Sequence, residues 1–268
     1  MKKTLCIVIP IVVVLLVLVG GLFYYIGNKN ASEQAMSGKD KEFLSVLSKG
    51  LEERSAFVKE QEKVSANGGT PKFTGADYSR ELVNKESKIF EFENAEFDSP
   101  RLSQLVKEYI DALKKQKEAV DYYSTDYIKY NDIWSKGYAE RSTVIAALCD
   151  EFGLKLGKDL AEEFKSNARA VSAEKDKTKQ IEDMITNIQF TKEKTEYSTS
   201  TYSATVENTT PYTFSSMSLT INLYKDDVIV ETLYDSTANW ESGEKVRFEF
   251  MTSKTFDKYK VKGEWYTD

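Results

Sequence analysis

The amino-acid sequence predicts a multi-domain chain with an N-terminal transmembrane helix, an all-α antiparallel helical bundle and an all-β sandwich. Three observations support this fold class. A run without charged side chains fills residues 4–26, apolar residues then recur at helical spacing, and a strict alternation of apolar and polar residues follows. The predicted organisation is a membrane anchor at 1–29, a linker at 30–42, a helical bundle domain at 43–186 and a sandwich domain at 187–268.

The uncharged run from Thr4 to Ile26 holds 23 residues. As a helix it would reach roughly 34 Å, slightly more than the hydrocarbon core of a bilayer. A cleaved signal peptide is the alternative interpretation. The run is longer than the apolar part of such a peptide, and residues 27–31 offer no cleavage site with suitably spaced small residues. We therefore expect an uncleaved signal anchor.

Lys2 and Lys3 lie directly before the run, which favours an N-terminus in the cytoplasm and residues 30–268 outside it. Three of the 37 basic side chains lie in residues 1–29, which hold no acid, so the rest of the chain has a net charge of −9. An acidic surface argues against binding nucleic acid or anionic lipid through overall charge.

The first half of the helical section predicts two helices. Leu44, Leu51 and Val58 recur every seven residues on one face of the first helix. A break rich in glycine follows at residues 67–71. The second helix is predicted over residues 76–97.

The second half predicts one long and one shorter helix. Ser99 followed by Pro100 is a favourable N-cap and first-turn pair, and the apolar stripe behind it predicts a helix as far as Phe152, with a bend near Gly137. A turn at residues 153–157 precedes the fourth helix. Because the connections are short, an antiparallel bundle is favoured over a parallel coiled coil.

The apolar period changes from 3.6 to 2 after residue 185. The clearest alternation has apolar residues at 217, 219, 221 and 223 with polar residues between them. Asp226 and Asp227 predict a hairpin, since Asp tolerates left-handed turn geometry, and residues 241–244 predict another turn. About seven short strands in the last third of the chain predict an antiparallel sandwich.

Several strand-end motifs of this domain match a known pattern. They are Val206-Glu-Asn208, Leu219-Thr-Ile221-Asn-Leu223-Tyr224, Val228-Ile-Val230 and Ser242-Gly243-Glu244. With these motifs, residues 187–266 resemble the FxLYD domain family, although Ile221 stands where that family has Phe and Lys225 where it usually has Asp. The resemblance implies an immunoglobulin-like sandwich and a bacterial cell-surface setting, and it supplies no catalytic residues.

The amino-acid composition excludes several classes of catalytic and metal-binding site. The chain has no histidine, which removes Ser-His-Asp and Cys-His nucleophiles and every histidine metal site. Cys6 lies in the apolar run, so Cys149 has no disulfide partner outside the membrane. The acidic residues between 91 and 98 lack the order of a calcium loop and are typical of a solvated face. We expect no catalytic residue, no cofactor and no metal site.

Aromatic residues are the candidate ligand contacts. A platform for sugar rings or a peptide is one interpretation, and packing at the edge of a helical core is the favoured one, because the spacing suits both. Tyr122 lies off the stripe and is the ring expected to be exposed. The candidates are Tyr122, Tyr127, Tyr130, Trp134 and Tyr138.

These observations favour a non-catalytic, membrane-anchored extracytoplasmic protein that binds or spaces components of the cell envelope. Its partners would be the membrane, through the single span at residues 4–26, and an envelope protein or polysaccharide. An accessory or sensor subunit that pairs with a membrane partner is the first alternative, and a hydrolase that uses two carboxylates is the second. The sequence leaves the oligomeric state open.

Overall fold

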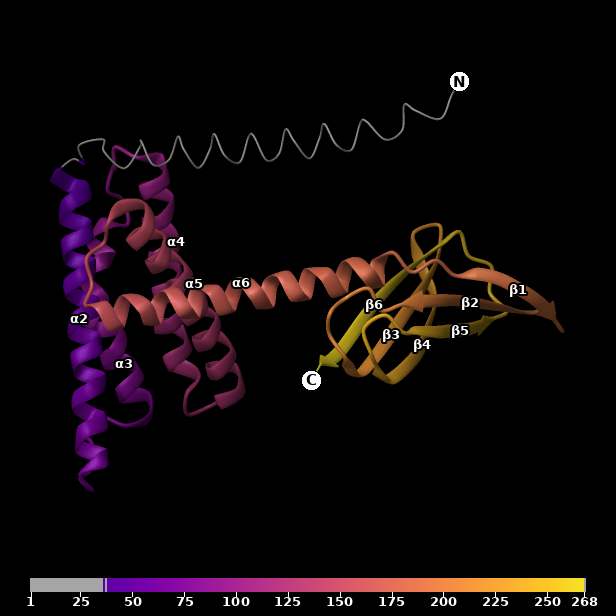
Figure 1. Cartoon of the computed structure of the whole chain (residues 1–268), viewed down its shortest axis with the longest axis horizontal. Helices are drawn as coiled ribbons and strands as arrows, with labels where there is room; N and C mark the ends of the chain where they lie inside the picture. The colour runs from indigo at the N-terminus through magenta and orange to yellow at the C-terminus, as the bar shows by residue number, and fades with distance from the viewer. Residues whose placement is uncertain (1–35, 37, 268) are drawn as a thin grey trace. The chain divides into compact units, whose positions relative to one another are not determined.

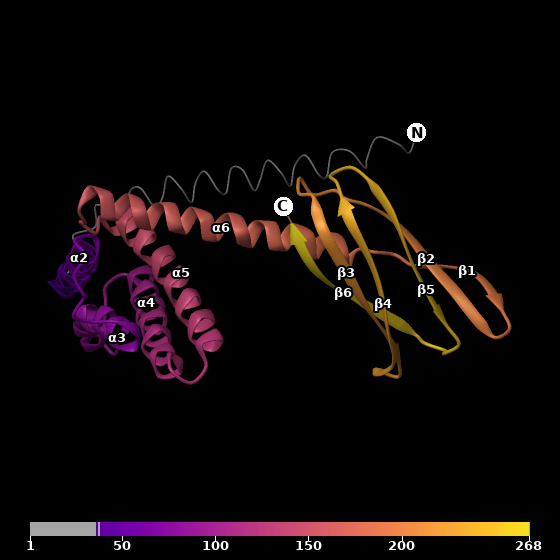
Figure 2. The same cartoon turned by 90° about the horizontal axis from the view of Figure 1, so that it is seen from below.

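The computed structural model of the chain describes residue 36 and residues 38–267 (Figures 1 and 2). Contacts divide the chain into two compact units, with the boundary between Val171 and Ser172. The first unit is helical, and the second contains the end of the last helix and two antiparallel sheets. Helices therefore precede sheets, as predicted.

The described residues form five α-helices and two short 3₁₀ helices. The bounds are α2 Gly38–Ala66, α3 Gly75–Glu86, η1 Ser87–Phe92, α4 Pro100–Ala119, η2 Val120–Tyr122, α5 Tyr127–Phe152 and α6 Lys158–Thr186. Helices α4 and α5 lie side by side as a hairpin (Figures 1 and 2).

The predicted fold class is corrected in one part, the N-terminal transmembrane helix. In residues 38–267, no helix is both long enough and apolar enough to cross a membrane. Each of these helices carries charged residues along its exposed face, and so it suits packing on a protein core with one side in water. The predicted span at residues 4–26 lies outside the described residues.

The single helix predicted from residue 99 to residue 152 is wrong, because the structure has two. Helix α4 ends at Ala119, and residues 120–126 turn the chain back. The carboxylate of Asp126 caps α5 by accepting a hydrogen bond from the amide of Lys129 at 3.0 Å. This polar N-cap decides where the new helix begins.

Gly137, where a bend was predicted, lies within α5, which runs as one helix from Tyr127 to Phe152. A Cβ atom at Gly137 would lie 2.8 Å from the carbonyl oxygen of Ala112 and 2.9 Å from Cγ of Gln116. Glycine is therefore required here because α4 and α5 approach closely.

The helix predicted over residues 76–97 is shorter in the structure. Helix α3 ends at Glu86, and the chain tightens into the 3₁₀ helix η1. The hydroxyl of Ser87 donates a hydrogen bond to the carbonyl of Asn84 at 2.8 Å. Local bonds of this kind compete with the continuation of a helix.

One apolar core holds the first unit together, and α2, α3, η1, α4, α5 and the start of α6 all contribute to it. Its central aromatic ring is Phe43, which meets Phe92 and Phe97 edge-on with ring centroids 5.5 and 5.7 Å apart. The heptad positions Leu44 and Leu51 are buried, as predicted.

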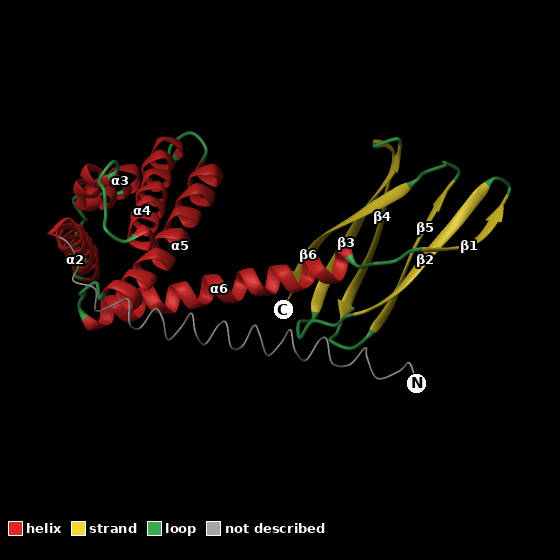
Figure 3. Cartoon of the chain, turned by 90° about the horizontal axis from the view of Figure 1, so that it is seen from above, coloured by secondary structure: helices red, strands yellow, loops and turns green. Residues whose placement is uncertain are grey.

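The second unit contains six strands, not the predicted seven or so, in two three-stranded antiparallel sheets. The orders are β1-β2-β5 and β4-β3-β6 (Figure 3). The bounds are β1 Thr191–Glu196, β2 Thr199–Glu207, β3 Phe214–Lys225, β4 Val228–Trp240, β5 Lys245–Thr252 and β6 Lys258–Thr267. The two sheets enclose a second apolar core.

The predicted alternation and turns of this unit are confirmed. The apolar residues at 217, 219, 221 and 223 are all buried. Asp226 and Asp227 both have positive φ, at 49° and 63°, and they form the two-residue loop between β3 and β4. Gly243, with φ at 81°, lies in the predicted turn between β4 and β5.

Helix α6 contributes to the second core as well as to the first. Ile181 and Ile185 are buried among the strand residues of the second unit. A methyl group at Gly263 of β6 would overlap with the side chain of Ile185, so this glycine lets the helix lie close to the strand. The C-terminal half of α6 is thus part of the second unit.

Candidate functional site

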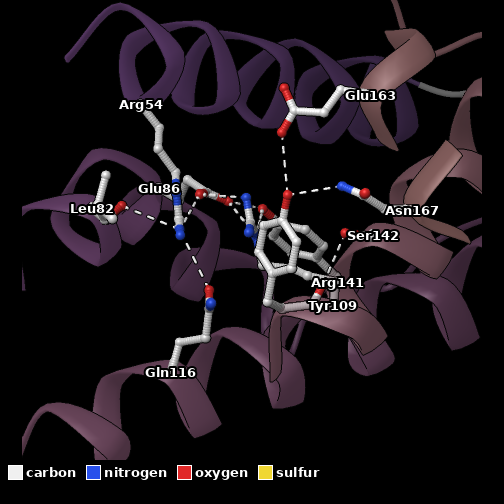
Figure 4. Close-up of polar contacts among 10 residues, drawn as sticks. Arg54, Leu82, Glu86, Tyr109, Gln116, Arg141, Ser142, Glu163 and Asn167 are labelled. Atoms are coloured by element: carbon white, nitrogen blue, oxygen red, sulfur yellow. Dashed lines mark hydrogen bonds and ion pairs between the residues drawn. The ribbon is translucent and has the colours of Figure 1, made fainter. Parts of the chain in front are cut away.

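A cluster of buried charged and polar side chains lies among the helices of the first unit (Figure 4). The carboxylate of Glu86 is at its centre. It accepts hydrogen bonds from Arg54 Nη1 at 2.7 Å, from Arg141 Nη2 at 2.8 Å and from Arg141 Nε at 3.1 Å. The hydroxyl of Tyr109 also donates to it. Helices α2, α3, α4 and α5 each supply one of these residues.

Two guanidinium groups share one carboxylate in this cluster, and all three groups are removed from water. Burial, and next the neighbouring charge of Arg141, lower the pKa of Arg54 to about 10. Within the described part of the chain, Nη1 of Arg141 and Nε2 of Gln116 are buried without a hydrogen-bond partner. The cluster is therefore only partly satisfied, although Arg54 Nη1 also lies 3.4 Å from the side-chain oxygen of Gln116.

Glycines bring the backbones together around this cluster. A Cβ atom at Gly50 of α2 would lie 3.2 Å from Cα of Glu86, while Gly137 of α5 faces Gln116 of α4. Because the side chains of Glu86 and Arg141 are 0% and 1% exposed, no ligand reaches them in this conformation. What the cluster can do is fix the register of four helices.

The candidate aromatic residues follow α5 towards this cluster. Tyr127 is 58% exposed at the start of the helix, whereas Tyr130 is buried and its hydroxyl lies 2.8 Å from that of Ser79. The ring centroids of Tyr127 and Tyr130 are 5.4 Å apart, and those of Tyr130 and Trp134 are 5.7 Å apart. The guanidinium of Arg54 lies 5.8 Å from the ring of Trp134, at the inner end of the row.

The other two candidates lie apart from this row. Tyr122 is partly buried, and Lys129 Nζ lies 3.8 Å from its ring centroid. The hydroxyl of Tyr138 donates to Glu163 at 3.2 Å and accepts from Asn167 at 2.8 Å. Burial, followed by the nearby charge of Glu163, raises the pKa of Tyr138.

The acidic residues between 91 and 98 and the cysteine considered in the sequence form neither a metal site nor an exposed thiol in the described residues. Glu93 forms an ion pair with Lys114. In the described residues, no three His, Cys, Asp or Glu side chains converge as a metal site would require. Burial raises the pKa of the Cys149 thiol, so this cysteine is less reactive than an exposed one.

The two sheets of the second unit differ in how their outward charges are arranged. On β1-β2-β5, Arg247 Nη2 lies 2.7 Å from Glu193 and 2.9 Å from Glu249. The hydroxyl of Ser203 donates to Glu193 at 2.6 Å, and this bond is the main reason why the pKa of that carboxyl is lowered. Arg247 is therefore paired with two carboxylates.

On β4-β3-β6, the exposed positions of β6 carry three lysines at every second residue. Lys258 is paired with Asp227, but Lys260 and Lys262 have no ion pair within the described part of the chain. The nearest aromatic ring to Lys260 is that of Tyr224, with Nζ 5.5 Å from its centroid. These three lysines, called the lysine row below, leave a net positive strip on an acidic protein.

A groove of about 660 Å³ runs along the same stretch of β6. Residues 256–262 line one side, and Thr186, Ile188 and Gln189 line the other. The hydroxyl of Tyr259 joins the two sides, because it donates a hydrogen bond to the carbonyl of Ile188 at 3.4 Å and accepts one from the nearby Phe190 amide at 2.9 Å. The lysine row and this groove together form the candidate binding site.

Neither site was predicted from the sequence, although parts of their signals are visible in it. Arg54 and Gln116 stand within apolar helical stripes, where a polar residue predicts a buried partner. The order Lys-Tyr-Lys-Val-Lys at 258–262 is typical of a strand with one basic face. Nothing in the pattern around Glu86 shows that it is the common acceptor.

Comparison of the chain with protein-family models, with curated proteins and with solved structures finds no match among any of the three. The resemblance of residues 187–266 to the FxLYD domain therefore stays a prediction.

Proposed function

We propose that this chain is a non-catalytic binding protein whose second unit recognises a negatively charged partner along β6. The observation that carries the proposal is the lysine row beside the groove. Lys260 and Lys262 are exposed and have no acidic neighbour within ion-pair distance in the described residues, whereas Arg247 on the other sheet is neutralised by two glutamates.

Unneutralised charge on one face favours a partner of opposite charge and speeds its association. An acidic envelope protein and an acidic polysaccharide both have this property, so either partner class expected from the sequence is compatible with the site. A location in the cell envelope stays a prediction, since it depends on residues 1–29, which lie outside the described residues.

The test uses the full chain immobilised on a sensor surface. The acidic probes are poly-L-glutamate and heparin, a sulfated polysaccharide. Poly-L-lysine is the control polymer of opposite charge. We expect the chain to retain at least one of the two acidic polymers and to release it as salt is raised, because exposed charges are screened. The double variant K260E/K262E should weaken retention by about tenfold or more, since it reverses the charge of the strip.

A matched control is K175E/K179E, which makes the same change in net charge at two exposed lysines of α6 in the second unit. It should retain the acidic polymer as the unaltered chain does. Retention of neither acidic polymer, or equal losses in the two double variants, would contradict the proposed function.

A further inference from the structure

We infer that residues 258–262 of β6 bind an extended peptide strand whose residues alternate between acidic and apolar. This inference rests on the proposed function and names the partner class and the mode of binding. The peptide would add to the sheet β4-β3-β6 as a fourth strand.

The first argument is the open edge of the sheet. In the described part of the chain, β6 pairs with β3 on one side only, so its other side presents backbone groups that can pair with an added strand. Helix α6 accompanies the second half of β6, where Ile185 contacts Gly263 and Lys177 donates to Thr267 at 2.6 Å (Figure 3).

The first half of β6 is therefore the accessible half. The groove begins where the helix ends, and it follows residues 258–262. Five residues of strand span about 17 Å, so the site suits a short extended segment and not a long strand.

The second argument is the alternation of side chains along this half. The three lysines are exposed, whereas Tyr259 and Val261 between them pack on the second core. All five residues line the groove, so its wall alternates between basic and apolar side chains. A strand paired with β6 presents its own side chains alternately to the same two sides. Acidic residues would lie beside the lysines, and apolar residues would enter the groove.

The third argument excludes a second copy of the same strand. Two β6 strands placed edge to edge would bring two lysine rows together, and like charges opposite each other oppose pairing. The same row attracts a strand that carries carboxylates. The lysines thus disfavour self-association and favour an acidic partner strand.

The experiment measures binding of Glu-Val-Glu-Val-Glu, with fluorescein on its N-terminal amine and an amide at its C-terminus, to the full chain by fluorescence anisotropy. We expect saturable binding, weakened about tenfold or more by K260E/K262E and unchanged by K175E/K179E. The neutral variant K260A/K262A should weaken binding less than the charge reversal does. Circular dichroism of each variant verifies that the sheets are formed.

Two further peptides separate strand addition from simple charge attraction. Glu-Glu-Glu-Val-Val has the same composition without the alternation. A version of the first peptide with N-methyl groups on alternate amides cannot donate the bonds that strand pairing needs. Both should bind at least about fivefold more weakly than the alternating peptide.

Equal affinity for all three peptides would overturn the inference. Tight binding of heparin that depends on Lys260 and Lys262, with no binding of the alternating peptide, would also overturn it, because the partner would then be a polysaccharide. Either result leaves the proposed function standing. If K260E/K262E bound the peptides and the acidic polymers as well as the unaltered chain does, both this inference and the proposed function would be contradicted.

Discussion

At the scale of single residues, Glu86 is the side chain on which most of the buried polar structure depends. It neutralises part of the charge of Arg54 and Arg141 and accepts from Tyr109. Arg54 could be noticed in the sequence as a charged residue on an apolar helical face. Its acceptor could not be identified, because Glu86 is 32 residues away and only the packing of α2 against α3 brings the two together.

Removal of the charge at Glu86 tests this dependence. We expect E86Q to lower the free energy of unfolding of the first unit by about 3–5 kcal/mol, because two buried guanidinium groups lose their common counter-charge. Urea unfolding followed by the helical circular dichroism signal measures the change. The control is E140Q, which breaks the more exposed pair between Lys115 and Glu140 and should change stability by about 0–1 kcal/mol. Similar losses in the two variants would show that the buried cluster has no special role.

At the scale of elements, the hairpin of α4 and α5 shows why an apolar stripe does not decide where a helix ends. The stripe continues through residues 120–126, so the sequence predicts one helix. The structure turns there instead, which places the two halves of the stripe against each other and buries the half on α4 and much of the half on α5. Gly137 then permits the close packing of the two helices.

The substitution G137A tests the close approach of the two helices. Alanine is a better helix former by about 1 kcal/mol, but the added methyl group would meet the Ala112 carbonyl oxygen at 2.8 Å. Because backbone atoms cannot move aside without shifting α4, the overpacking costs about 1–3 kcal/mol. After the gain of about 1 kcal/mol in helix propensity, we expect a net loss of about 1 kcal/mol. Thermal unfolding measures it. In the control G38A, the new methyl group has nothing within 4 Å, and stability should stay the same or rise slightly.

At the scale of the whole molecule, the chain divides within α6 and not at its end. Phe164 is buried in the first core, whereas Ile181 and Ile185 are buried in the second. The amphipathic pattern of this helix is visible in the sequence. It does not show which residues belong to which core, since both cores select the same kind of apolar side chain.

Two fragments of the chain test this division. Residues 172–268 retain the end of α6, and we expect them to fold with a cooperative thermal transition and strand-type circular dichroism. Residues 187–268 lack Ile181 and Ile185, each of which contributes about 2–5 kcal/mol when buried, and should be unfolded or loosely packed. Binding of a hydrophobic dye to the shorter fragment only would report the exposed core. Equal stability of the two fragments would show that the helix end is dispensable.

Local chemistry in the sequence determines the order of helices and strands, the alternation along β3, the Ser99 cap and the two aspartates of the hairpin loop. Each of these depends on residues a few positions apart, whose effects act before the chain is packed. Tertiary structure decides the break between α4 and α5, the partner of the buried arginines, the place of Ile185 in the second core and the open half of β6. These features depend on which distant surfaces meet, and the hydrophobic effect that brings surfaces together rewards buried area without specifying a partner. Side-chain volume and hydrogen-bond geometry then select among the arrangements, and both are properties of the packed chain.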